Sequence, residues 1–332
     1  MNLHPMQPVR PEPRVDSLLK QMSLTGFQGR KLGESVDIWS RMIQEPDVTI
    51  LAGLSGAMVP AGMQECLISL LENRFIDVLV STGANIFHDI CEHIGIRHYL
   101  GYHTVDDQEL FRQGIDRIYD IFAYEDEFRL VDEKIAEFAQ ELDDFSDSSA
   151  EFIRLLGIWL SKRYPLGRSL TATAAHLNIP VFIPALCDSS IGIALVMTRR
   201  KGHQIMIDQL ADADQLTGYV ERAQKTGVVY IGGGVPKNFI QQTQVIASIH
   251  EQGCGGHDYA IQYTTDTPHY GGLSGCTFEE AVSWGKESCN CRKVQCFCDA
   301  TIAIPIVTSA LLGAGIRRTA HPWMENELKQ VS

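Results

Sequence analysis

The sequence predicts an α/β fold with a doubly wound, mostly parallel sheet and helices on both of its faces. Three observations predict this fold. Short apolar runs alternate with helical patterns, each apolar run ends in a turn of Gly, Ser, Thr or Asp, and the 332 residues have an ordinary globular composition of 45% apolar and 21% charged residues. Alternation of strands and helices places the strands parallel and joins them by right-handed crossovers.

The elements follow in order along the chain. Helices are predicted over residues 15–22 and about 32–39, and a strand–turn–helix unit covers residues 48–72. Residues 104–178 are mostly polar, and we expect them, Gly114–Tyr119 included, to form helices packed on the sheet rather than a separate domain. The six predicted strands are residues 48–52, 77–80, 181–186, 228–231, 259–263 and 294–298.

The turns that end these strands lie at one edge of a parallel sheet, where a doubly wound fold opens its ligand crevice. A dinucleotide would fit there, because small residues let the backbone approach a phosphate. No strand-bound G-x-G-x-x-G occurs, and Gly53-x-x-Gly56 and the Gly232 triplet are looser forms that tight turns also use. Asp188 and Asp299 fit either ribose hydroxyl acceptors or helix N-caps.

The best candidate for chemistry is Lys286, two residues after Trp284 and shortly after the glycine-rich segment 270–275. A lysine amine whose pKa is lowered by its surroundings forms an imine with a carbonyl or iminium carbon. An indole face attracts cationic amines. From the spacing alone, a surface lysine capping a helix beside a tryptophan in the core is the more common explanation.

The charge composition of the chain limits the kinds of partner that we expect. The net charge of −13 argues against nucleic acid and leaves cationic small molecules as plausible partners. Residues 101–150 hold fifteen Asp and Glu against four Lys and Arg, as solvated helix faces commonly do.

Three segments are expected: a flexible N-terminal arm over residues 1–14, one domain over 15–320 and a C-terminal tail over 321–332. The arm has no apolar signal region, and the longest uncharged run, Ala300–Ile316, is too short and too polar to span a bilayer. A cytoplasmic protein with no membrane association is predicted.

Nine cysteines without a signal region indicate reduced thiols. Four of them form two C-x-C pairs, Cys289 with Cys291 and Cys296 with Cys298. We favour small buried hydrophobes, with metal binding as the alternative, and assign no metal to the site.

Five motifs together resemble the deoxyhypusine synthase family, in order from about residue 14 to 315. They are residues 25–28, 77–80, 184–188, 232–237 and 280–286. The resemblance implies a Rossmann-like NAD-binding fold and a homotetramer with active sites shared across dimer interfaces. It also implies transfer of an aminobutyl group from spermidine through a lysine imine to a protein lysine, or to putrescine in the related homospermidine synthases.

The resemblance also implies roles for individual residues. Lys286 would be the nucleophile, Trp284 a wall over the aliphatic chain of the substrate and Glu280 an anchor for an amine. Asn238 stands where the family has its proton-transferring histidine. The residues implied for NAD are Ser55, Met58, Thr82, Gly83, Asp188, Gly232, Gly233, Thr265, Asp299 and Ala300.

Other positions depart from the family. Leu273 and Ile193 replace two aspartates, and Phe87 and His88 replace paired glutamates. A buried ammonium without a partner costs several kcal/mol, so a different amine is favoured as the substrate, one with a guanidinium, a carboxylate or a shorter chain. The leading hypothesis is therefore an NAD-dependent aminoalkyl transferase acting on a small amine. The alternatives are a true deoxyhypusine synthase and a catalytically silent NAD-binding homologue.

Overall fold

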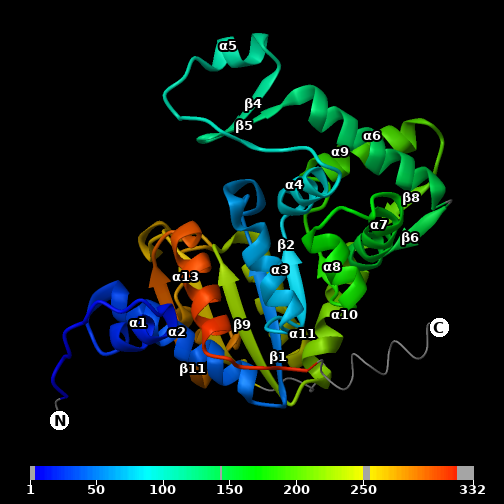
Figure 1. Cartoon of the computed structure of the whole chain (residues 1–332). Coiled ribbons are helices and arrows are strands. Elements are labelled where there is room, and N and C mark those ends of the chain that lie inside the picture. The colour runs from blue at the N-terminus through cyan, green and yellow to red at the C-terminus, as the bar shows by residue number, and fades with distance from the viewer. Residues whose placement is uncertain (1–3, 143, 250–254, 320–332) are drawn as a thin grey trace. The chain divides into compact units, whose positions relative to one another are not determined.

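The computed structural model describes residues 4–142, 144–249 and 255–319. Their Cα positions form two compact units, each discontinuous in sequence (Figure 1). The sheet unit comprises Met1–Ser55, Ser69–Val80 and Ala213–Ser332, and the helical unit comprises Gly56–Ile68 and Ser81–Asp212. Each unit is described by itself.

The sheet unit contains five strands of a six-stranded sheet, in the order β11-β10-β9-β1-β2. The pairs β1/β9, β9/β10 and β10/β11 are all parallel. The register aligns their carboxyl ends, since Leu54 and Tyr263 both pair with Ile231. The strand bounds are β1 (Val48–Leu54), β2 (Val78–Ser81), β9 (Lys225–Ile231), β10 (His257–Thr264) and β11 (Glu287–Phe297).

Helices flank this sheet and pack their apolar side chains against it. In α2, Val36, Trp39, Met42 and Ile43 recur at helical spacing and are buried. The unit's helices are α1 (Val15–Met22), α2 (Phe27–Gln44), the C-terminal part of α3 (Gln64–Glu72), most of α10 (Gln209–Arg222), α11 (Gly234–Ile249), α12 (Phe278–Ser283) and α13 (Ala300–Gly313), with a short 3₁₀ turn, η2 (Pro268–Tyr270).

The helical unit consists mainly of helices. They are α4 (Gly83–His93), α5 (Asp107–Arg112), α6 (Glu125–Glu141), α7 (Ser149–Arg163), α8 (Leu170–Leu177) and α9 (Ser190–Arg200), preceded by the π-helical turn η1 (Val59–Met63). Its strands are β3 (Tyr99–Leu100), β4 (Ile115–Ile118), β5 (Ile121–Tyr124), β6 (Phe145–Asp147), β8 (Ile205–Ile207) and the sixth strand of the large sheet, β7 (Val181–Phe182).

Asp89 of α4 fixes the start of α8 within this unit. Its carboxylate accepts hydrogen bonds from the backbone N–H groups of Leu170 and Thr171 at 2.7 and 2.8 Å, from the Thr171 hydroxyl and from Gln64. A carboxylate at a helix N-terminus satisfies N–H groups that have no partner within the helix.

The predicted fold class is confirmed, and the six predicted strands correspond to β1, β2, β7, β9, β10 and β11. Two predictions were wrong. Gly114–Tyr119 is not helical, because Ile115–Ile118 forms β4 of the antiparallel sheet β3-β5-β4. The strand at Val181 ends at Phe182 instead of Leu186.

The predicted single domain over residues 15–320 stays a prediction. Residues 4–14 of the expected arm contain no helix or strand, and the expected tail 321–332 lies outside the described residues. Within the described part of the chain, no helix combines the length and the apolar character that a membrane crossing requires.

Candidate functional site

Lys286 is placed by the short helix α12 and by the glycine that ends it. Thr277 caps the helix, since its hydroxyl accepts a hydrogen bond from the backbone N–H of Glu280. Gly285 has a φ of 70°, and the N–H of Lys286 donates to the carbonyl of Ala281 at 3.1 Å. Gly285, in the left-handed conformation, thus ends α12, and the chain continues directly into β11.

The amine of Lys286 lies between Asn238 and Trp284. Its Nζ donates to Oδ1 of Asn238 at 2.8 Å and lies 5.7 Å from the centre of the Trp284 ring. Trp284 is 66% exposed, so the explanation of this residue as a core anchor is wrong. Lys286 is half-buried, and Asn238 can accept a hydrogen bond but cannot take up a proton.

A second lysine, Lys237, lies buried in the same unit and is only 1% exposed. Its Nζ donates to Oε1 of Gln262 at 2.8 Å and to the carbonyl of Cys276 at 2.7 Å. Burial lowers the pKa of Lys237 to about 8, and the charge of Lys286 acts in the same direction. Lys237, the residue that directly precedes Asn238 in the sequence, therefore carries a buried ammonium group.

Two glutamines brace the loop before α12. Gln262 donates to the carbonyls of Gly232 and Ser274 at 2.9 and 2.8 Å. Gln295 donates to Oε1 of Gln262 at 2.7 Å and to the carbonyl of Cys276 at 3.2 Å. Because both glutamines lie on sheet strands, the loop is fixed to the sheet itself.

Glu287 follows Lys286 and is 1% exposed. Its Oε1 accepts a hydrogen bond from Gln241 at 3.1 Å. Burial raises the pKa of Glu287 to about 8, although Gln241 and Lys237 act in the opposite direction. The carboxyl group next to Lys286 is therefore mostly protonated at neutral pH.

The turn after β9 lies against the same loop. Gly232 and Gly234 have φ of 83° and 56°, which favour glycine. The N–H of Gly234 donates to the Ser274 hydroxyl at 2.9 Å, and the Ser55 hydroxyl donates to the carbonyl of Gly233. A Cβ on Gly233 would lie 2.4 Å from Cα of Ser274, so only glycine fits there.

The other residues implied for NAD in the sheet unit also follow strand ends. Ser55, Gly232 and Thr265 come after β1, β9 and β10, while Asp299 and Ala300 come after β11. The shared register brings these carboxyl ends to one edge, so the residues present fit a dinucleotide. Asp299 is also the N-cap of α13, since its Oδ1 accepts hydrogen bonds from the N–H and hydroxyl of Thr301.

The remaining residues implied for NAD belong to the helical unit. Thr82 is the N-cap of α4, and its hydroxyl donates to the carbonyl of Gly56 at 2.8 Å. Met58 precedes η1, and a Cβ on Gly83 would lie 2.3 Å from the Ser189 hydroxyl. Asp188 is exposed and precedes the N-cap position of α9, so its N-cap interpretation is wrong.

Two of the departures from the family lie on the surface of their units, whereas Phe87 and His88 are buried at 2% and 8% exposure. Leu273 is 48% exposed in the sheet unit, and Ile193 is 55% exposed in the helical unit. Glu280, the predicted amine anchor, is exposed in the first turn of α12.

The described cysteines are all free. Cys296 is buried, as predicted, but Cys289 is exposed, so the interpretation of all four as buried hydrophobes is wrong for Cys289. Across the described ranges, no three His, Cys, Asp or Glu side chains are grouped so that they could hold a metal ion.

Five polar residues behind Lys286 were not predicted as site residues: Lys237, Gln262 and Glu287, which are buried, and Gln295 and Ser274, which are half-buried. The two glutamines had a detectable signal, because each interrupts one of the predicted apolar runs, residues 259–263 and 294–298. A polar side chain inside a buried strand must find a partner, and here the partner is the loop that carries the site.

Comparisons with known proteins place this geometry in context. The family model "Deoxyhypusine synthase" matches residues 17–311. The chain is 58% identical over 297 residues to "Probable deoxyhypusine synthase 2" of Methanosarcina acetivorans, covering 90% of this chain and 86% of that one. It is 52% identical to the protein of the same description from Archaeoglobus fulgidus, covering 91% and 98%.

Among solved structures, a putative deoxyhypusine synthase from Entamoeba histolytica has the same fold. Its TM-score is 0.64 at 18% identity, over 92% of this chain and 95% of that one.

Proposed function

The chain belongs to the deoxyhypusine synthase family, and from this premise we propose that it is an NAD-dependent transferase that moves an aminoalkyl group between small amines through an imine on Lys286. One observation carries the proposal. The Lys286 amine is half-buried, is hydrogen-bonded to Asn238 at 2.8 Å and lies beside the exposed face of Trp284.

The residues around Lys286 suit an imine-forming amine. The Asn238 amide oxygen accepts one N–H of Lys286, which orients the nitrogen without taking its proton. Trp284 offers an aromatic face to a cationic amine substrate and limits the access of water to the nitrogen. Glu280, in the exposed first turn of α12, offers a carboxylate to a second ammonium group.

NAD, when bound, would supply hydride transfer from and to the carbon that carries the amine. The residues that would hold it in the sheet unit are Ser55, Gly232, Gly233, Thr265, Asp299 and Ala300. Gly232 and Gly233 lie in the turn directly after β9, at the edge of the sheet where a doubly wound fold binds its ligand. Asp299 keeps Oδ2 for a ribose hydroxyl, because Oδ1 caps α13.

A small amine is favoured over spermidine because two acidic partners are replaced by apolar side chains, Leu273 and Ile193. Both are about half exposed and neither can pair with an ammonium group. A substrate with fewer ammonium groups, or one that carries its own carboxylate, avoids an unpaired charge.

Borohydride trapping tests the proposal. The protein is incubated with NAD and a panel of diamines and polyamines, reduced, and mapped by peptide mass spectrometry. We expect one amine to leave an adduct on Lys286 that Lys286→Arg abolishes, because the guanidinium cannot form the imine. The absence of an adduct with every amine would support the silent homologue instead.

Two variants of Asn238 sharpen this test. Asn238→Ala removes the hydrogen bond to Lys286, which for a charged group contributes about 1.5–3 kcal/mol, so we expect adduct formation to slow by roughly ten- to a hundredfold. Asn238→Asp keeps an acceptor at the same place and should retain much more of the rate. Equal rates for the two variants would contradict the orienting role of Asn238.

True deoxyhypusine synthesis is the second candidate, because the relatives from Methanosarcina acetivorans and Archaeoglobus fulgidus carry that description. An assay with acceptor protein, spermidine and NAD separates the two candidates. Modification of a protein lysine would establish the second candidate and reject the first.

We also propose a homotetramer. The antiparallel sheet β3-β5-β4 and α5 expose large apolar side chains, among them Leu100 at 94% and Phe111 at 80%. Exposed apolar groups of this size are typical of protein–protein contact surfaces.

A further inference from the structure

A cavity of about 620 Å³ lies within the helical unit, at the end of α4. Three segments form its wall: the end of α4 with the turn after it, the loop between α7 and α8, and the first turn of α3. Thr82 and Gly83, which are implied for NAD, lie at the start of α4, and a helix of 11 residues is about 16 Å long. The cavity is therefore separate from these two residues.

Contacts between the three segments hold the wall of the cavity in place. Gln64 of α3 donates to Oδ1 of Asp89 at 2.7 Å, and Asp89 also binds the start of α8. Ser169, the N-cap of α8, has its hydroxyl 2.8 Å from Nδ1 of His93. A Cβ on Gly167 would lie 2.3 Å from the carbonyl oxygen of His93, so only glycine lets the loop lie this close to α4. These contacts form the cavity without any ligand.

Three arginines line the cavity: Arg97 after α4, Arg163 at the end of α7 and Arg168 before α8. Their side chains are 49–64% exposed. Nη1 of Arg97 donates to Oε2 of Glu92. Nη2 of Arg163 donates at 3.0 Å to Glu137, which lies outside the cavity wall. A guanidinium group has five N–H donors, so Arg97 and Arg163 both keep N–H groups for a further acceptor.

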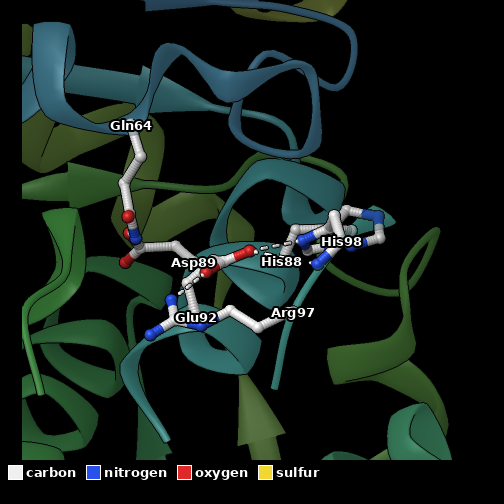
Figure 2. A network of polar contacts seen from close by, with 6 residues as sticks. All are labelled: Gln64, His88, Asp89, Glu92, Arg97 and His98. Carbon is white, nitrogen blue, oxygen red and sulfur yellow. Dashed lines mark hydrogen bonds and ion pairs between the residues drawn. The ribbon is translucent and has the colours of Figure 1, made fainter. Parts of the chain in front are cut away.

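The carboxylates of the wall are fewer than its guanidinium groups. Glu65 and Glu92 are the acidic side chains among the described residues that line the cavity. Both oxygens of Glu92 are engaged, Oε1 with Nδ1 of His98 at 2.7 Å and Oε2 with Arg97 (Figure 2). Both oxygens of Glu65 accept from Nε of Arg168 at 3.1 Å. The wall therefore has an excess of positive charge, which favours an anion.

His93 adds a donor that has no partner. The Ser169 hydroxyl oxygen accepts the N–H of Ala172 at 3.1 Å, and within the described residues its own hydrogen has Nδ1 of His93 as acceptor. Neutral His93 then carries its hydrogen on Nε2, since the other tautomer would leave two groups without a partner instead of one. Nε2 is buried beside Gly167 and forms no hydrogen bond in the part of the chain that the structure describes. Its N–H directs the positive end of a dipole toward the loop that carries two of the arginines.

We propose that this cavity binds a phosphate monoester, whose phosphate group is held by Arg97, Arg163 and Arg168. A phosphate monoester has three terminal oxygens and close to two negative charges at neutral pH, so several guanidinium groups can bind it at once. A carboxylate has two oxygens and matches the edge of a single guanidinium group. Arginines from separate segments around one cavity therefore suit a phosphate better.

The cavity also has room for the organic part of such a molecule. Its volume lies in the range of sites for small organic ligands and exceeds that of a phosphate group. Tyr164, Pro165 and Leu166 give one side of the wall an aromatic and apolar surface. None of the residues that line the cavity is implied for NAD or for an amine, so this site goes beyond the proposed transferase.

Isothermal titration calorimetry of the full-length protein at pH 7.5 tests the site. The probe is ribose 5-phosphate. Ribose is the control without phosphate, and succinate is the dicarboxylate control. We expect binding of ribose 5-phosphate, no binding of ribose and much weaker binding of succinate, and we expect added salt to weaken the phosphate binding by screening. Saturating NAD should leave the affinity unchanged, because Thr82 and Gly83 lie at the other end of α4.

Variants locate the binding. Arg97→Gln, Arg163→Gln and Arg168→Gln each remove a guanidinium group, and each should weaken binding roughly ten- to a hundredfold, as loss of a charged hydrogen bond does. Arg97→Lys keeps the charge without the forked geometry and should lose less than Arg97→Gln. The matched control is Arg112→Gln, which removes an exposed ion pair with Glu109 elsewhere in the same unit and should bind as the wild type does. Near-UV circular dichroism verifies that each variant keeps its fold.

The outcomes decide the proposal. Loss of affinity in the three arginine variants, with full affinity in Arg112→Gln, supports the site. Absence of binding, equal binding of ribose, or binding of succinate as tight as that of the phosphate would each overturn it. Full affinity in all three arginine variants, or displacement of the probe by NAD, would show that the phosphate binds elsewhere and would overturn it as well.

Discussion

Glu287 is the single residue whose ionisation most directly affects the stability of the site. Its carboxyl has an ordinary pKa of 4.5 and is shifted to about 8 by burial in the folded protein. Between these two values the unfolded chain has released a proton that the folded protein retains. Stability therefore falls as the pH rises from about 4.5 to 8, by about 1.4 kcal/mol per unit at most.

We predict that Glu287→Gln stabilises the protein in a pH-dependent way. Glutamine imitates the protonated acid and cannot ionise, so the variant should be more stable than the wild type by roughly 3 kcal/mol at pH 7. At pH 4.5 the difference should almost disappear. Urea unfolding of both proteins at pH 5, 6, 7 and 8 measures it, and a difference that is constant across this range would contradict the buried protonated carboxyl.

At the residue scale, the sequence predicted which side chains lie beside Lys286 better than it predicted the residues that hold them in place. Trp284 and Lys286 follow the end of α12, Asn238 lies near the start of α11, and the three side chains come together. Lys237 was missed because its role depends on a carbonyl group, that of Cys276, which only the folded loop presents. Side-chain contacts with backbone atoms distant in sequence leave no pattern in the sequence.

At the scale of elements, the contact between the turn after β9 and the loop before α12 determines where Lys286 stands. Gly233 permits this contact, because a Cβ there would lie 2.4 Å from Cα of Ser274. The turn is also bound to the loop by the Ser274 hydroxyl and by Gln262. Any side chain at this position would push the loop away from the sheet.

We predict that Gly233→Ala destabilises the protein by about 1–3 kcal/mol, as overpacking of a tight contact does, and that it slows adduct formation on Lys286. The matched control is Gly218→Ala in α10, where a Cβ meets no atom within 4 Å. Alanine favours a helix over glycine, so this variant should gain about 0.5–1 kcal/mol. Thermal unfolding measures the change in stability, and borohydride trapping measures the rate of adduct formation. Equal stabilities and equal trapping rates for the two variants would contradict the close contact between Gly233 and Ser274.

The strands of the large sheet were predictable as elements because each buried apolar run is bounded by turn residues. The antiparallel sheet β3-β5-β4 was not. Its strands have two to four residues, β3 is exposed, and α5 has no buried residue, so no alternation of apolar and polar side chains marks them. Such short strands are specified by pairing and turn geometry, which a periodicity search does not detect.

At the scale of the whole molecule, the net charge of −13 and the exposed apolar groups bear on association. Like charge opposes self-association, so a tetramer requires apolar contacts that outweigh the repulsion. The side chains of Leu100 and Phe111 are nearly free of contacts within their own unit. They are the first candidates for such contacts.

We predict a solution mass four times the 36.9 kDa of one chain, measured by light scattering after size-exclusion chromatography. The double substitution Leu100→Ser with Phe111→Ser should lower that mass and leave the far-UV circular dichroism unchanged, because neither side chain supports the core. A wild-type mass of one chain rejects the tetramer. A variant that keeps the full mass places the contacts elsewhere on the surface.

The loop before α12 is anchored at Ser274 and Cys276, while Gly271, Gly272 and Leu273 ahead of these anchors are exposed. Exchange of the exposed residues therefore leaves the anchors, and with them Lys286, in place. Under the proposed function, substrate preference can then change independently of the reactivity of Lys286. Transplanting residues 271–273 from a relative into this chain should change the amine that is accepted and leave borohydride trapping on Lys286 intact.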